Sequence, residues 1–150
     1  MKAYKTAIKE YTLKIDSKNT SFLKCKISKS SDAYEYIKQF YFDDIEIYES
    51  FFVLMVNRAN ITTGFVKISQ GGTTGTIADP KIIAKYAVDS LASGIILAHN
   101  HPSGNEKPST CDENLTKKIK TALEFLDILV LDHIILTENS FYSFADEGNL

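Results

Sequence analysis

The distribution of apolar residues along the chain separates segments of strand character from segments of helical character. Residues 49–57, ESFFVLMVN, form an almost unbroken apolar run of aromatic and β-branched side chains, which is typical of a central, buried strand. A polar turn at 58–60 separates this run from 61–69, ITTGFVKIS, which predicts an antiparallel partner strand. Further strands are predicted over 4–15, 95–98, 128–137 and 141–145.

The clearest helical pattern covers residues 79–94, DPKIIAKYAVDSLASG. Asp79 is a suitable N-cap, Pro80 suits the first helical position, and Gly94 is the predicted stop at the C-terminal end. A helix with these bounds places four apolar residues on one face, and we expect that face to pack on the sheet. The four residues are Ile83, Tyr86, Ala87 and Leu91.

Two further helices are predicted on either side of this one. Residues 30–42, SSDAYEYIKQFYF, predict a helix whose cap lies near Ser31 or Asp32. A later helix is expected to begin at Ser109, because an apolar stripe at helical spacing follows that residue. The residues of this stripe are Leu115, Ile119, Ala122 and Leu123.

The mixture of hairpins and helical crossovers predicts an α/β fold. The expected architecture is a three-layer-like sandwich, with a mixed, mostly antiparallel sheet flanked by helices. No repeat or linker of biased composition divides the 150 residues, so we expect a single domain over 1–150. Its core is expected over about 40–150, and 1–39 form a basic extension with a strand and a helix.

The net charge of −2 is unevenly distributed along the chain. Residues 1–30 contain eight lysines and two acidic residues, whereas the other 120 residues contain nine basic and seventeen acidic ones. Such a basic segment either contacts phosphate or an acidic partner, or protects a sheet edge with solvated lysines. The overall pI of about 5.9 argues against broad, sequence-independent DNA binding, which needs a basic face.

Cysteine content and hydropathy limit the compartment. Cys25 and Cys111 form neither a disulfide framework nor a CxxC motif, and both are consistent with free thiols in a reducing environment. No apolar run approaches the ~20 residues of a membrane span, and the N-terminal residues lack the apolar centre of a signal peptide. We therefore expect a cytoplasmic protein without a membrane partner.

The segment 97–112, LAHNHPSGNEKPSTCD, contains the main candidate chemistry. His99 and His101 are two residues apart, so in an extended segment both imidazoles face one side and provide a seat for a cation such as zinc. Asp112 can add an oxygen ligand, which leaves a fourth position for water. Ser109 and Asp112 also match the Ser-x-x-Asp capping pattern, which is a purely structural explanation.

Taken together, these residues resemble the JAMM motif of the MPN/JAB metallopeptidase superfamily. That motif has an upstream glutamate, His-x-His, seven residues, serine, two residues and aspartate. Here the corresponding residues are Glu49, His99, His101, Ser109 and Asp112. The resemblance implies a cytidine-deaminase-like MPN/JAB fold and one Zn²⁺ per chain, held by the two histidines and the aspartate.

The neighbouring sequence is similar to one branch of this superfamily, the RadC-like proteins. SGIILAHNHPSGNEKPS, VLDHIIL and YSFADEGNL look like the RadC-type JAB domain, and the resemblance covers roughly residues 40–150. Full-length members carry a region resembling a helix-hairpin-helix DNA-binding module, which residues 1–40 do not resemble. The chain therefore looks like the short, stand-alone RadC-like proteins, in a family associated with DNA repair.

The resemblance implies a zinc-dependent hydrolase of peptide or isopeptide bonds. Metal-bound water is the nucleophile in such a site, because zinc lowers the pKa of water from 15.7 to about 7. Glu49 is the candidate that accepts and returns the proton; Glu46 is the rival by position alone. Ser109 is expected to donate a hydrogen bond to the developing oxyanion.

Several alternatives stay open at this stage. Cys111 is either a packing residue or a helix-start thiol, His133 is either a buried core residue or a partner of a ligand, and Asn100 is expected to anchor the loop. One alternative function is a non-enzymatic interaction module in DNA repair or on mobile elements, acting through Lys24, Lys26 and Lys29. Another is a metal-dependent nuclease. Apolar edge strands would also permit a homodimer.

Overall fold

A computed structural model describes residues 22–41, 44–72 and 77–150. Within these ranges a five-stranded sheet has the strand order β2-β1-β3-β4-β5. β3 and β4 run parallel and the other neighbouring strands run antiparallel, so the sheet is mixed and mostly antiparallel, as predicted. The elements are α1 (Ser30–Lys38), β1 (Ser50–Val56), β2 (Thr62–Gln70), α2 (Pro80–Asp89), β3 (Gly94–Asn100), α3 (Thr110–Glu124), β4 (Leu129–Leu136) and β5 (Phe141–Ser143).

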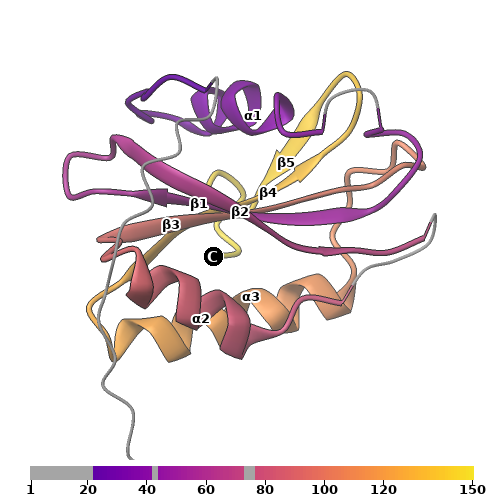
Figure 1. Ribbon diagram of the computed structural model, residues 1–150. Helices are drawn as coiled ribbons and strands as arrows, with labels where there is room; N and C mark the ends of the chain where they lie inside the picture. The colour runs from indigo at the N-terminus through magenta and orange to yellow at the C-terminus, as the bar shows by residue number, and fades with distance from the viewer. Residues whose placement is uncertain (1–21, 42–43, 73–76) are drawn as a thin grey trace, which may run out of the picture.

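The helices cover both faces of the sheet. α1 lies on one face, and α2 and α3 lie together on the other (Figure 1). Every residue of β1 and β3 is buried, which explains why both strands are apolar without alternation. On β1, Phe52 belongs to the core under α1, whereas Phe51 and Val53 belong to the core under α2 and α3. The predicted α/β sandwich is therefore confirmed.

The connection from β3 to β4 determines where a site can form. α3 carries the chain back across the sheet between these two parallel strands, so the end of β3 and the beginning of α3 lie at the same edge. β1 runs antiparallel to β3, with Phe51 opposite His99. The beginning of β1 therefore also reaches this edge of the sheet.

α2 confirms the predicted beginning of its segment and corrects the end. Asp79 caps the helix by accepting a hydrogen bond from Lys81 N, and Pro80 is the first helical residue. The helix ends at Asp89 because Leu91 has a positive φ of 52°. Gly94 begins β3, where a Cβ atom would come within 3.1 Å of Leu131 Cδ1.

The predicted faces of the helices are only partly correct. Ile83 and Ala87 of α2 are buried, whereas Tyr86 and Leu91 are exposed, and Leu91 lies beyond the end of the helix. On α3, Ile119 and Leu123 are buried as predicted and Leu115 packs against the core, but Ala122 is exposed.

α1 begins slightly earlier than the sequence predicts. Its N-cap is Lys29, and Asp32 is the third helical residue rather than the cap. The Asp32 carboxylate accepts hydrogen bonds from the main-chain N–H groups of Ser28 and Lys29, so it still satisfies free donors at this end. The predicted strand at 4–15 lies outside the described residues. In the described part of the chain, no helix is long and apolar enough to cross a membrane.

Candidate metal centre

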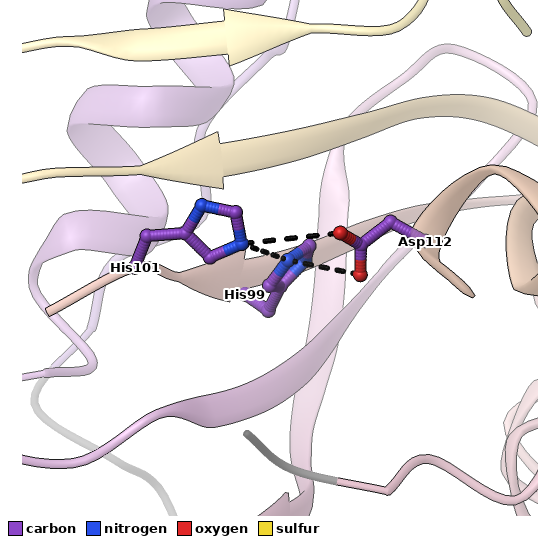
Figure 2. A group of neighbouring side chains, drawn as sticks. All are labelled: His99, His101 and Asp112. Atoms are coloured by element: carbon purple, nitrogen blue, oxygen red, sulfur yellow. Dashed lines mark hydrogen bonds and ion pairs between the residues drawn. The ribbon is translucent and has the colours of Figure 1, made fainter. Parts of the chain in front are cut away.

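Three side chains converge at the edge where β3 ends and α3 begins. His99 lies on β3, His101 follows that strand, and Asp112 lies in the first turn of α3; their ring nitrogens and carboxylate oxygens point toward one another (Figure 2). The two Nε2 atoms are 3.0 Å apart, Asp112 Oδ1 is 3.3 Å from His99 Nε2, and Asp112 Oδ2 is 3.9 Å from His101 Nε2. Ligand atoms around tetrahedral zinc are about 3.4 Å apart. The spacing therefore fits a bound metal ion.

His101 is held by the loop that follows β3. Its Nδ1 lies 2.5 Å from the carbonyl oxygen of Asn105. Because a carbonyl oxygen only accepts hydrogen bonds, Nδ1 carries the proton, and in the neutral ring Nε2 keeps its lone pair. That lone pair faces His99 and Asp112, which is the orientation that a metal ligand requires.

His99 is almost completely buried, with 1% of its side chain exposed. Its ring stacks on Phe51, with a centroid distance of 5.8 Å and an angle of 6° between the planes. Burial lowers the pKa of His99 to about 4; Asp112 acts in the opposite direction, and His101 lowers the pKa further. The imidazole is therefore neutral near pH 7, the form that binds a metal.

Asp112 caps α3 and also belongs to the group of side chains that could hold a metal ion. Its Oδ2 accepts hydrogen bonds from Ser109 N at 2.7 Å and Ser109 Oγ at 2.6 Å, while Asp112 N donates to Ser109 Oγ at 3.2 Å. This is the capping box of α3. Oδ1 faces His99, and the positive end of the helix dipole favours a carboxylate here. The cap therefore holds the carboxylate in the orientation that a metal needs.

Asn100 acts as an anchor through its side chain, but it holds the segment 45–50 before β1 and not the loop that follows β3. Its side chain is buried on the α1 side, where Oδ1 accepts from Ser50 N at 2.8 Å. Nδ2 donates to the carbonyl oxygens of Ile45 and Tyr48, the latter at 2.8 Å. These three hydrogen bonds fix the segment 45–50 beside the end of β3.

Glu49 belongs to that anchored segment and reaches the same groove as His101. Its main chain extends the β1–β2 pairing, with Glu49 N donating to Gly72 O and Gly71 N donating to Glu49 O. A groove of about 430 Å³ runs along the site. It is lined by Glu49, His101, Pro102, Ser103, Asn105, Lys107, Pro108 and Ser109. Glu46 is exposed in the preceding turn and is not among these lining residues.

His133 lies directly behind His99, which resolves the two alternatives that its sequence left open. It is fully buried, and its Nε2 is 2.9 Å from His99 Nδ1. Its Nδ1 is 2.6 Å from Thr116 Oγ1. His133 is thus both a core residue and the partner of a candidate ligand.

Sequence reasoning did not single out Thr116. Its position four residues after Asp112 on a helix was the available signal, because such residues share one helical face. A threonine within an otherwise apolar stripe also indicates a specific hydrogen bond. Cys111, in contrast, is exposed and lies outside the group that can hold a metal ion.

Comparison with known proteins agrees with the family resemblance seen in the sequence. A family model described as "RadC-like JAB domain" matches residues 27–149. A "UPF0758 protein" of Flavobacterium johnsoniae is 46% identical over 123 residues, which are 82% of this chain and 53% of that protein. Proteins of the same name from Porphyromonas gingivalis and Janthinobacterium sp. are 40% and 41% identical, over 83% and 69% of this chain and 54% and 46% of their own length.

The chain spans about half the length of the curated relatives it matches. The matched region contains β1–β5, α1–α3 and all the residues of the candidate metal centre. Both the sequence match and the fold lead to one assignment: the chain belongs to the RadC-like JAB domain family.

Proposed function

We propose that this protein is a zinc-dependent hydrolase that cleaves a peptide or isopeptide bond. The observation that carries the proposal is the convergence of His99, His101 and Asp112 beside an open groove. Two ring nitrogens and a carboxylate oxygen, at distances that suit one small ion, form a set of three protein ligands. Catalytic zinc sites use three protein ligands and keep the fourth position for water or substrate.

The chemistry of the donor atoms favours zinc over harder cations. Two of the three ligand atoms are imidazole nitrogens, which suit zinc, whereas magnesium and calcium prefer oxygen ligands. A bound zinc ion would supply a nucleophile near neutral pH by lowering the pKa of a water molecule, and would also polarise a carbonyl group.

Glu49 is the residue that we assign to proton transfer. It is partly buried and lines the groove next to His101, so it lies beside a substrate bound in that groove. It would accept a proton from the attacking water and deliver it to the leaving amine nitrogen. Asn100 supports this role, because its hydrogen bonds hold the segment that carries Glu49.

Ser109 is assigned to the substrate oxygen. Its hydroxyl now donates to Asp112 Oδ2, so it must turn toward the groove before it can donate to an oxyanion. The main-chain N–H of Ser109 still donates to Asp112 after such a rotation, so the carboxylate keeps a hydrogen bond. A peptide substrate, rather than a nucleic acid, is proposed from the resemblance to JAMM peptidases and from the net charge of −2.

The test begins with the metal content of protein purified without chelator. We expect about one zinc per chain in the wild type and in Cys111→Ala, and loss of zinc in His101→Ala. The wild type should then hydrolyse members of a panel of peptides and isopeptide-linked peptides. This activity should disappear with a chelator and return when zinc is added.

Two results would overturn the proposal. One is a wild-type protein that holds no zinc and takes none up, which favours the non-enzymatic interaction module. The other is a metal-dependent cleavage of DNA without hydrolysis of any peptide, which favours the nuclease. Full peptide hydrolysis by His101→Ala would reject the assigned metal site itself.

A further inference from the structure

A series of buried hydrogen bonds connects two of the candidate ligands behind the metal centre. His99 Nδ1 lies 2.9 Å from His133 Nε2, and His133 Nδ1 lies 2.6 Å from Thr116 Oγ1. Thr116 Oγ1 in turn lies 2.6 Å from the main-chain carbonyl oxygen of Asp112. The series starts at a ligand on β3, crosses β4, and ends at the backbone of a ligand on α3.

The last hydrogen bond of this series sets the direction of all the others. A carbonyl oxygen only accepts, so the Thr116 hydroxyl donates to Asp112 O. The hydroxyl has one proton, so toward His133 its oxygen accepts and His133 Nδ1–H donates. In the neutral ring, His133 Nε2 is then an acceptor, and His99 Nδ1–H must donate to it.

Burial is consistent with a neutral His133. The ring is fully buried and stacks on Phe144, with a centroid distance of 4.8 Å and 13° between the planes. Its two ring nitrogens contact Thr116 Oγ1 and His99 Nδ1, and neither of these is a carboxylate that would hold a second proton on the ring. With one proton on each ring, the only proton of His99 lies on Nδ1, and Nε2 carries a lone pair.

We propose that Thr116 and His133 are positioning residues that hold His99 in the Nδ1–H tautomer and thereby raise the affinity of the site for zinc. This inference rests on the metal site of the proposed function and adds the residues that prepare it. The Thr116 hydroxyl also connects the backbone of Asp112 to His133 on β4, so one network of hydrogen bonds orients two ligands.

Loss of the Thr116 hydroxyl would release this constraint. His133 could then carry its proton on Nε2 and donate to His99 Nδ1. His99 would in that case carry its own proton on Nε2, the atom that faces His101 and Asp112. Metal binding would have to reverse both tautomers, and partners of this kind typically account for about 10- to 100-fold in metal affinity.

The matched variants are Thr116→Val, which keeps the shape but removes the hydroxyl, and Thr116→Ser, which keeps the hydroxyl. Thr121→Val, an exposed position on the same helix, is the control. Zinc affinity is measured by competition with a chromophoric chelator. We expect Thr116→Val to bind zinc about 10- to 100-fold more weakly. Thr116→Ser and Thr121→Val should stay near the wild type.

A second measurement tests the tautomer without metal or activity. Long-range ¹H–¹⁵N correlation spectra of the metal-free protein identify which ring nitrogen of each histidine carries a proton. We expect Nδ1–H on both His99 and His133 in the wild type, and Nε2–H on His99 in Thr116→Val. A wild-type spectrum with Nε2–H on His99 would overturn the inference, even if no variant folds.

The outcomes separate this inference from the proposed function. If the wild type binds no zinc, the proposed function fails, and the spectra still decide the tautomer. If the wild type binds zinc and Thr116→Val binds it equally well, with His99 unchanged, the positioning role is rejected and the hydrolase proposal stands. Weaker binding by both Thr116→Val and Thr116→Ser would also reject it, because the hydroxyl would then not be the cause.

Discussion

The candidate metal centre has two halves that are built by different means. The inner half consists of His99, His133 and Thr116, which are at most 1% exposed and contact one another within the core. The outer half consists of His101, Ser109 and Glu49, which line the groove. The outer residues are oriented through loop and main-chain hydrogen bonds, such as that from His101 to the Asn105 carbonyl oxygen.

This difference matches what each half would have to do in the proposed hydrolase. Metal binding needs an unprotonated imidazole, and burial keeps His99 neutral. Substrate attack needs access for a water molecule and a polypeptide, which only an open groove provides. We therefore expect changes at His133 and Thr116 to alter metal affinity and stability, and changes at Glu49 and Ser109 to alter turnover. His101 is both a candidate ligand and a lining residue of the groove, so its loss should affect both.

The largest expected effect is in the outer half. Glu49→Gln should lower the turnover number for the peptide substrate by about 10²- to 10⁴-fold, because the amide cannot accept the proton. Zinc content and thermal stability should stay at the wild-type values. Glu46→Gln is the matched control and should retain full activity. A Glu49→Gln protein that has lost its zinc would show that the two halves are not separate.

The next largest effect concerns the pH dependence of the inner half. In the metal-free protein the pKa of His99 is about 4, whereas in the unfolded chain it is about 6.5. Between these values the unfolded chain binds more protons, so the free energy of unfolding decreases as the pH falls through this range. The loss attributable to His99 is about 3 kcal/mol in total, of which about 2 kcal/mol falls between pH 7 and pH 5.

Urea denaturation of the metal-free protein at pH 7 and pH 5 measures this change. Burial also lowers the pKa of His133, so this residue adds to the loss of stability on acidification. His99→Gln should lose less stability on acidification than the wild type, since the variant has no imidazole to protonate at that position. An equal loss in both proteins would contradict the assignment of a buried, neutral His99.

The smallest expected effect comes from Asn100, whose side chain holds the Glu49 segment beside the end of β3. Asn100→Ala removes three hydrogen bonds and leaves Ser50 N and two carbonyl oxygens without this partner, which should cost about 1 to 3 kcal/mol of stability. Turnover should fall about tenfold, because Glu49 loses its anchor. Zinc affinity should change little, since Asn100 faces α1 and the ligands face α3. Asn114→Ala, exposed on α3, is the control.

Local sequence patterns determined a large part of this protein. The apolar run of β1, the Asp79-Pro80 start of α2 and the Ser109-Asp112 cap of α3 follow from interactions among residues close in the chain. The spacing of His99 and His101 likewise places both rings on one side of an extended segment. Such patterns are readable because they depend on backbone geometry and on neighbours a few residues away.

The tertiary structure decided which distant residues complete the site. His133 contacts His99 because β4 lies parallel to β3 and α3 packs over both, a register that no local pattern specifies. Asn100 holds the Glu49 segment across fifty positions of sequence because β1 pairs antiparallel with β3, which is also a long-range register. Gly94 lies in a strand and not at a helix end, at a place where Leu131 and Val56 leave little room for a side chain. Hydrogen bonds between buried polar groups need both partners in place, and only the packed sheet brings them together.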